Sequence, residues 1–520
     1  MSALRRSLPA CPPRVVGHLA SARGESWRFA AITAGLFTLL TAWRLIEHEL
    51  WRDEAWLWLV VRESGSLAEM FAALGRSGQG NLYPLLADLV HQLSDSWRAL
   101  QALNLVITAA AALLFARWAP LARPLRVLVL LGYFPFYEYA VFSRHYALGM
   151  LLLWIACAAA ASRRPALGLG ASLGLLCQTT VYGFILAVAV GVGWLSDRWP
   201  RRDDLPRIPR GEAIAGGALA LGGALAGLWQ LRPLPGTSFA PGWHFGWEPA
   251  IATRVLRLPW RAFVPLPRFE LHFWNSNLLD GVASLQPWLG WVTFVVAVAI
   301  LRPRRASLVT FAVGGLGLAA FAYTKYVGEG RHAGHLWLLF LAALWLGGGL
   351  HETVGRRSWR EWTVSAVVVC QVIAGGFASA MDLVHPFSNA ARTAAEVRAV
   401  GLDRLPLLGY REPPAASVAL ALGQPLFSPA RGLFTTHPDW GPEQRDLPLD
   451  TVRCRARGLA RRTGKDVGLV VNQELPGWPE IEPVGEILGA ILESEDYRLY
   501  RLRADRLAAT RAFAGCNAGE

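Results

Sequence analysis

The sequence predicts an all-α polytopic membrane protein with a small α/β domain at its C-terminal end. Three observations support this fold class. Hydrophobic residues make up 53% of the 520 residues and charged residues only 17%, whereas soluble chains carry about 25% charged residues. Apolar runs of helical length recur between residues 29 and 381. The segment 382–520 instead alternates between helical and strand patterns, which is typical of an α/β domain.

The composition excludes several classes of protein. So much apolar side chain must be buried that an intrinsically disordered chain is excluded. Six cysteines scattered over the chain are too few for a disulfide framework. The net charge of +13 is unevenly distributed, because residues 382–520 hold 17 basic and 18 acidic residues and the first 381 hold 34 and 20. We therefore interpret the basic excess as a signal of membrane topology and not as a nucleic-acid surface.

The apolar runs are interpreted as transmembrane helices, because a backbone inside a bilayer must satisfy its own hydrogen bonds. The first run lacks a small-residue cleavage site and is interpreted as a retained span. Several runs are shorter than the ~20 residues of a full span, so we expect about 11 spans (10–13). Glycines within 168–174 and 314–321 are expected to allow close helix packing. The runs are 29–46, 98–117, 125–140, 146–162, 165–178, 181–196, 213–230, 286–301, 307–323, 335–350 and 362–381.

Basic residues in the short loops set the predicted orientation. Arginines concentrate in segment 1–28 and in alternate loops between the runs of the transmembrane domain 29–381, which places these segments in the cytoplasm. The extracytoplasmic side then holds the loop 47–97, the loop 231–285 and the C-terminal domain. The apolar stretch 82–93 is interpreted as a helix at the outer surface. Lysine is nearly absent, as in GC-rich bacterial genes, so the expected location is the bacterial cytoplasmic (inner) membrane.

The C-terminal domain 382–520 is predicted to be extracytoplasmic and to have an α/β fold. Cys454 and Cys516 both lie in it, and they are expected either to pair or to remain two free thiols. The predicted elements are a helix over 389–400 capped by Ser388, a helix capped by Asp450 that ends at Gly464, and strands over 466–473 and 497–502.

The loop 47–97 contains the first group of candidate functional residues. Asp53 and Glu54 follow directly after the first predicted span, between Trp51 and Trp56. One interpretation is that both are solvated carboxylates at the membrane surface. The other is that one of them is a general base, since a carboxylate partly desolvated by tryptophans can accept a proton from a hydroxyl. Adjacent residues of a helix point about 100° apart, so Asp53 and Glu54 would not share one role.

A second group lies in the stretch 137–148, at the predicted outer ends of two spans. It contains Glu138, Arg144 and His145. A charged group near the bilayer costs roughly 2–4 kcal/mol unless it is paired or solvated. These side chains are therefore expected either to snorkel to the interface or to pair within a site. Three arginines at helical spacing over 254–261 are interpreted instead as part of an amphipathic helix that contacts lipid phosphates.

A third group is the unusually polar turn 324–335, with Lys325, Arg331 and His332. Arginine and lysine hold phosphate by charge-assisted hydrogen bonds, so the turn is expected to be either a solvated loop or an anion site. The sequence has no spacing typical of a metal site and no Walker loop. Any energy for chemistry is therefore expected to arrive with the substrate.

The order of these features resembles the polytopic, lipid-dependent glycosyltransferases of the GT-C class. It looks most like the branch with protein O-mannosyltransferases and the aminoarabinose transferase of lipid A. The resemblance covers about residues 29–350 and is sharpest over 47–91. Two departures are a Gly-Asn-Leu-Tyr-Pro sequence in place of the usual His-Pro-Pro, and the absence of an acid after the Ser-Arg turn. The shared features are a first span, Asp53-Glu54, Gly80 to Pro84 with Tyr83, and the Ser143-Arg144 turn before Tyr146.

The resemblance implies an enzyme that moves a sugar from a polyprenyl-phosphate carrier to an acceptor hydroxyl on the outer face, usually with inversion. The implied partners are that lipid-linked donor, a glycan, lipid or protein acceptor, and membrane lipid, without nucleic acid. No cofactor is required by the pattern, and a divalent cation stays open. The implied site residues are Asp53 as catalytic base with Glu54 beside it, Lys325 and Arg331 on the carrier phosphate with Arg144 as a further candidate, and His332, His145, Glu138 and Tyr83 around the substrates.

Two other functions are compatible with the sequence. A transporter or flippase of a lipid-linked sugar would also have many spans and phosphate-binding arginines, but it predicts charges near the bilayer midplane and often inverted repeats. The charges here gather towards one face, and the sequence shows no internal repeat. A non-enzymatic assembly protein is the third interpretation, and it would tolerate the loss of Asp53, Lys325 and Arg331 together.

Overall fold

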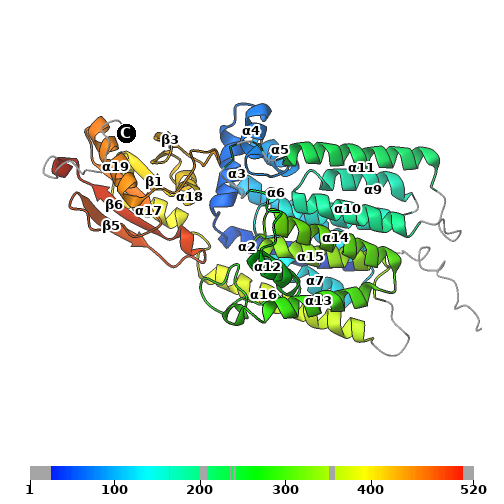
Figure 1. Cartoon of the computed structure of the whole chain (residues 1–520). Coiled ribbons are helices and arrows are strands. Elements are labelled where there is room, and N and C mark those ends of the chain that lie inside the picture. The colour runs from blue at the N-terminus through cyan, green and yellow to red at the C-terminus, as the bar shows by residue number, and fades with distance from the viewer. Residues whose placement is uncertain are drawn as a thin grey trace, which may run out of the picture.

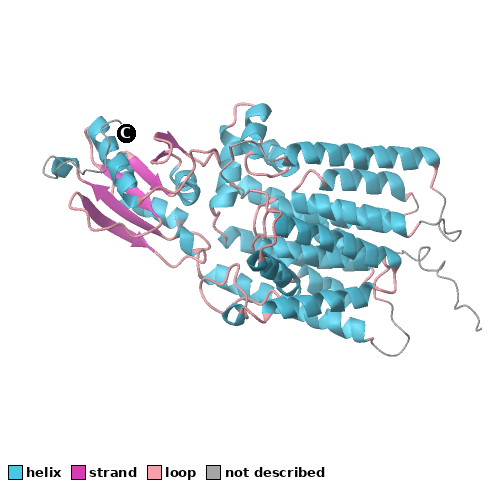
Figure 2. Ribbon diagram, in the orientation of Figure 1, coloured by secondary structure: helices cyan, strands magenta, loops and turns pink. Residues whose placement is uncertain are grey.

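The computed structural model describes residues 25–162, 164–198, 208–232, 234, 236–237, 242–350 and 358–507. A bundle of helices is followed by a smaller C-terminal unit, and the two lie one after the other along the long direction of the molecule (Figure 1). All strands of the described residues belong to the C-terminal unit (Figure 2). The structure is therefore mostly helical with a small C-terminal sheet.

The apolar runs of the sequence form helices, except that the run 125–140 is divided into the short α7 and a π-helical turn. Among the described helices, α2, α6, α11, α14 and α16 are long and apolar enough to cross a membrane, and α8, α9, α10 and α13 are shorter apolar helices. These helices indicate a membrane protein. The bundle helices are α2 (Trp27–Glu47), α6 (Arg98–Trp118), α7 (Arg123–Leu130) with the π-helical turn Tyr133–Glu138, α8 (His145–Ala160), α9 (Pro165–Leu176), α10 (Val181–Ser196), α11 (Arg210–Leu231), α13 (Gln286–Leu301), α14 (Arg305–Thr324), α15 (Gly330–Leu346) and α16 (Trp359–Val384).

Shorter helices lie in the segments that connect this bundle. The segment between α2 and α6 forms α3 (Arg52–Glu63), α4 (Leu67–Gly75) and α5 (Leu82–His91). Figure 1 shows them at the end of the bundle next to the C-terminal unit, which we call the domain end. The predicted helix over 82–93 corresponds to α5. The arginines of 254–261 lie on α12 (Pro249–Phe263), which packs on α13 and α15.

Basic segments gather at the opposite end of the bundle. The Glu25 carboxylate lies 2.8 Å from Arg123 Nε, and its backbone N–H donates to the Arg117 carbonyl. Gly349, after α15, lies against the Pro120 carbonyl. Glu25, the 117–126 loop and the first residues after α15 therefore meet at this end. Residues 1–24, Arg163 and the basic segments 199–207 and 351–357 lie outside the described residues.

Glycines bring α9 and α11 into close contact. A Cβ on Gly223 would overlap Gly174, and one on Gly216 would overlap the Ala166 carbonyl. Small residues let helix backbones approach closely where lipid provides no hydrophobic driving force. The predicted packing role of the 168–174 glycines is confirmed for Gly170 and Gly174.

The C-terminal unit is a three-layer α/β structure. The sheet order is β3-β2-β1-β4-β6-β5, with β1 parallel to both β2 and β4 and the other neighbours antiparallel. Alternate strand residues face opposite layers, so Leu408 packs with α19 and Leu407 with α17 and α18. The elements are α17 (Ala390–Ala399), β1 (Leu407–Tyr410), α18 (Glu412–Leu422), β2 (Leu426–Ser428), β3 (Leu433–Thr435), α19 (Leu449–Thr463), β4 (Val467–Val471), β5 (Ile481–Ile487) and β6 (Tyr497–Leu502).

The predicted C-terminal elements are present, with two corrections to their caps. The predicted helix and strands correspond to α17, β4 and β6, but Asn389 and not Ser388 holds the cap position of α17, and Ser388 Oγ accepts the Ala390 N–H. Asp450 is not a cap, because Pro448 holds the cap position of α19 and places Asp450 in its first turn. Cys454 is disulfide-bonded, so it is not a free thiol, while Cys516 lies outside the described residues.

We expect the glycine contact between α9 and α11 to be essential for their packing. Gly223→Leu should lower the free energy of unfolding by about 1–3 kcal/mol, because overpacking of a close contact forces the backbones apart. Gly222→Leu is the matched control, since a Cβ at Gly222 meets no neighbouring atom within 4 Å. Thermal unfolding in detergent measures both, and equal melting temperatures for the two variants would contradict the packing role.

Candidate functional site

The two carboxylates of the Asp-Glu pair lie in different environments at the start of α3. The Asp53 side chain is 25% exposed, whereas Glu54 is fully buried. Glu54 Oε2 accepts the Trp51 N–H at 3.4 Å and closes the first turn of α3. Only Asp53 is therefore accessible to a substrate, and the expectation that the two residues differ in role agrees with this geometry.

Two arginines from distant segments face Asp53. Arg144 Nη1 lies 3.4 Å from Asp53 Oδ2 and donates to the Asp53 carbonyl at 2.7 Å. Arg331 Nη2 lies 3.7 Å from the same carboxylate oxygen. Arg144 precedes α8 and Arg331 opens α15, so the fold joins three of the polar groups that the sequence singled out. The result is a carboxylate with two cations beside it.

Aromatic rings hold Arg331 in place. Its guanidinium carbon lies 5.4 Å from the centre of the Trp51 ring and 5.2 Å from that of Trp274. Behind these rings, Glu138 accepts hydrogen bonds from Trp274 Nε1 at 2.9 Å and from the Tyr133 hydroxyl at 2.8 Å. Glu138 is thus buried behind the rings that contact Arg331, and its hydrogen bonds orient these aromatic side chains.

Several buried donors at the site have no hydrogen-bond partner within the described part of the chain. They include Nε of both Arg144 and Arg331, and the hydroxyls of Ser143 and Tyr83. A buried donor without a partner costs about 1–3 kcal/mol. Tyr83 is placed by α5 close enough to interact electrostatically with Glu54 and Arg144. An oxygen-rich ligand would satisfy these groups.

Glu54 belongs to a buried chain of charges behind Asp53. Its Oε1 accepts the Ser143 N–H at 2.6 Å, and its Oε2 lies 3.5 Å from His48 Nε2. His48 Nδ1 lies 3.0 Å from Asp382 of α16, which in turn pairs with Arg44 of α2 at 2.7 Å. Burial alone would lower the pKa of His48, but Asp382 and Glu54 outweigh it and raise that pKa to about 9.

The other predicted residues lie around this centre. His332 Nδ1 accepts the Glu329 N–H at 2.8 Å, and its Nε2 is 3.2 Å from the Tyr146 hydroxyl. The His145 ring lies 4.2 Å from the Tyr146 ring. Lys325 Nζ lies 5.3 Å from the centre of the Trp243 ring. Whereas the sequence grouped Lys325 with Arg331, the structure pairs Arg331 with Arg144 at Asp53.

An apolar groove lies among the bundle helices and includes the start of α15. It has a volume of about 270 Å³ and lies between α12, α13, α14 and α15. Its walls are largely aliphatic and aromatic, with Leu256, Phe294 and Leu318 among them, and it extends to Tyr182 and His332. His332 follows Arg331 directly in α15, so the groove includes the sequence neighbour of Arg331, although Asp53, Arg144 and Arg331 do not line it.

The sequence interpretation missed Arg44, His48 and Asp382, although charged residues within or next to an apolar helix are a signal of function or pairing. Within the described residues, no group of three or more His, Cys, Asp and Glu side chains is arranged to hold a metal ion. Comparisons with protein-family models, with curated proteins and with solved structures found no match. The function must therefore be inferred from the geometry of the site.

The charge on His48 predicts a pH dependence of stability. Because its pKa rises from about 6.5 to about 9 on folding, the stabilisation is complete below pH 6.5 and is lost as the pH approaches 9. Unfolding followed from pH 6 to 10 should show this loss in the wild type and not in His48→Gln. His385→Gln, at the end of α16, is the control that should keep the wild-type profile. An unchanged profile in His48→Gln would contradict the assignment.

Proposed function

We propose that this protein is a membrane glycosyltransferase of the GT-C type, which moves a sugar from a polyprenyl-phosphate carrier to an acceptor hydroxyl. The observation that carries the proposal is the meeting of Asp53 with Arg144 and Arg331, together with an apolar groove whose lining includes His332, the residue after Arg331. The reaction needs a base, a cation for the leaving phosphate and an apolar path for the carrier. These three features lie together here.

Asp53 is the proposed general base. Its partly exposed carboxylate accepts the proton of the acceptor hydroxyl as the hydroxyl oxygen attacks the anomeric carbon. The bond from that carbon to the phosphate oxygen breaks, and its electron pair leaves with the phosphate. Attack from the side opposite the phosphate inverts the anomeric centre. Glu54 cannot replace Asp53 in this role, because it is buried and already bonded to Ser143 and Trp51.

Arg331 and Arg144 are the proposed ligands of the carrier phosphate. Each keeps a buried Nε–H without a partner in the described structure, and guanidinium groups form short, charge-assisted hydrogen bonds to phosphate. Trp51 and Trp274 restrict the guanidinium of Arg331, so little ordering is needed when the phosphate binds. Fixed positive charge where negative charge develops lowers the barrier. His332, His145 and Tyr83 would provide the other polar side chains around the bound sugar phosphate.

The proposed topology follows from the two ends of the bundle. With about 11 spans, the basic N-terminus and the 117–126 loop lie in the cytoplasm, and the domain end lies outside the bacterial inner membrane. The groove between α12, α13, α14 and α15 then holds part of the isoprenoid chain near the outer surface. The sugar phosphate is itself activated, which agrees with the absence of a nucleotide motif in the sequence.

A flippase of a lipid-linked sugar is the alternative function. It requires polar groups along a path through the bilayer. Asp53 instead lies on α3, which Figure 1 shows at the domain end, and Arg144 and Arg331 lie beside it. This arrangement favours transfer at one surface over passage across the membrane.

Asp53→Asn should reduce sugar transfer by about 10²–10⁴-fold, the usual contribution of a general base, without loss of folding. The assay uses proteoliposomes with radiolabelled polyprenyl-phosphate hexoses and pentoses, and it separates transfer from translocation. Glu47→Gln is the matched control, since Glu47 is an exposed carboxylate at the end of α2. Wild-type turnover in Asp53→Asn would overturn the assignment, and translocation without transfer would establish the flippase.

Arg331→Gln should raise the KM for the lipid-linked donor by about 10- to 150-fold, equivalent to the loss of one charged hydrogen bond of about 1.5–3 kcal/mol. Arg98→Gln controls for the general effect of removing a cation from the domain end, because Arg98 opens α6 and lies over Trp97. Initial rates at varied donor concentration give both values. A donor KM equal to that of wild type would place the carrier phosphate elsewhere.

A further inference from the structure

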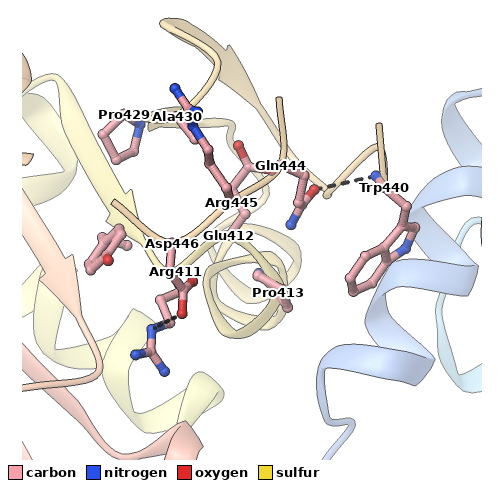
Figure 3. A pocket seen from close by; sticks show the side chains of 10 residues that line it. Arg411, Glu412, Pro413, Pro429, Ala430, Trp440, Gln444, Arg445 and Asp446 are labelled. Atoms are coloured by element: carbon pink, nitrogen blue, oxygen red, sulfur yellow. Dashed lines mark hydrogen bonds and ion pairs between the residues drawn. The ribbon is translucent and has the colours of Figure 1, made fainter. Parts of the chain in front are cut away.

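A second, chemically different pocket lies in the C-terminal unit, and the proposed reaction does not use it. It has a volume of about 170 Å³ and lies where β1 and β2 end, between the start of α18 and the segment 440–446. Figure 3 shows Pro429 and Ala430 at one end of it, Trp440 at the other end, and Arg411 beside Asp446. Pockets for drug-sized ligands are about 300 Å³ or more, so this one fits a single small ring.

The position of the pocket in the sheet is one where ligands bind. In the sheet, β1 lies between β2 and β4. The chain forms β2 on one side of β1 and later forms β4 on the other side, so the strand order reverses at β1. Ligands of open α/β sheets bind outside the carboxyl ends of the strands, at such a reversal. Tyr410 ends β1, and Pro429 and Ala430 follow β2. The pocket therefore lies at this edge of the sheet.

A buried carboxylate defines the polar wall of the pocket. The Glu412 side chain is only 6% exposed, its Oε1 lies 3.3 Å from Arg431 Nε, and it also accepts from the Ser428 hydroxyl. Its Oε2 has no hydrogen-bond partner within the described residues. A buried carboxylate oxygen of this kind requires a donor, and an O–H group of a ligand can supply it.

The rest of the lining selects for a neutral ligand. Arg411 Nε pairs with Asp446 at 2.9 Å at the open side of the pocket, and Glu412 pairs with Arg431. With Arg445 included, the lining holds two arginines and two carboxylates, so it has no net charge and offers no excess charge to an anion. Gln444 accepts a hydrogen bond from the Trp440 backbone N–H at 3.3 Å. Its side-chain amide adds another polar group to the lining. The aromatic and proline surfaces match the C–H faces of a sugar ring. The paired carboxylates and arginines beside them match its hydroxyl groups.

The pocket lies on the side of the unit that faces the candidate active site. Trp56 Nε1 of α3 donates to the Pro438 carbonyl at 2.9 Å, two residues before Trp440. Arg52, next to Asp53, donates to the Ser494 hydroxyl at 2.7 Å, and the Asn472 amide after β4 bonds the Ser494 carbonyl. The carboxyl ends of β1 and β4 are therefore connected to the start of α3 through a few direct contacts.

We propose that this pocket binds one neutral sugar unit and that it is the acceptor subsite, which makes the acceptor a glycan. The chain of that glycan extends from the pocket towards Asp53, where its hydroxyl is deprotonated. The acceptor role rests on the proposed glycosyltransferase function, whereas sugar binding by the pocket does not. Of the glycan, lipid and protein acceptors that the sequence left open, the lining favours the first.

Direct binding tests the pocket independently of transfer. The full-length protein in nanodiscs is titrated, by calorimetry and saturation-transfer NMR, with trisaccharides of glucose, mannose, galactose and arabinose and with a galacturonic acid trisaccharide. We expect at least one neutral trisaccharide to bind and the acidic one to bind at least tenfold more weakly. Failure of every neutral trisaccharide to bind, or preference for the acidic one, would overturn the proposal.

Variants locate the binding to the pocket. Glu412→Gln and Asp446→Asn should each weaken the binding of the neutral trisaccharide at least tenfold. Because Asp446 is exposed at the open side, its variant tests the pocket even if Glu412→Gln unfolds. Glu486→Gln, an exposed carboxylate on β5 that pairs with Arg498, should bind as wild type does. Asp53→Asn should also keep binding, so lost transfer and lost binding are distinguishable. Undiminished binding in Asp446→Asn would place the sugar elsewhere.

Discussion

The buried chain of charges from Arg44 through Asp382 and His48 to Glu54 is the constraint on which the rest of the site depends. Each of these groups would be costly alone in an apolar bundle, and each is stabilised by the next. The chain joins the end of α2 to α16 and to the first turn of α3. It therefore fixes the direction in which α3 leaves the bundle, and with it the position of Asp53.

This constraint explains why two adjacent carboxylates differ so much in environment. Glu54 points inwards and holds the Ser143 N–H, which positions the next residue, Arg144, beside Asp53. Asp53 points towards the two guanidinium groups and stays partly exposed. A residue that organises the site thus lies next to a residue that can act on a substrate, and the helical rotation between neighbours separates the two roles.

The C-terminal unit extends the same end of the structure. Arg52 bonds both the Glu495 carboxylate and the Ser494 hydroxyl, and Arg76 of the segment after α4 pairs with Asp439. These contacts involve residues on both sides of Asp53 in the sequence. The unit is therefore attached to the elements that present the proposed base, and its own pocket is held in a defined position with respect to that base.

The sequence by itself determined the helices of the bundle, because an apolar run in a bilayer has to satisfy its backbone as a helix. It also singled out Asp53, Arg144 and Arg331 as candidate site residues, since charges beside apolar runs are costly and rare. Short strands such as β2 and β3 were not predicted, because three residues carry too little pattern. Only the tertiary structure decided which cations meet Asp53, that Glu54 is buried and that Asp382 reaches His48. These contacts join residues 91 or more positions apart, and local sequence patterns record burial and periodicity but not the register between distant helices.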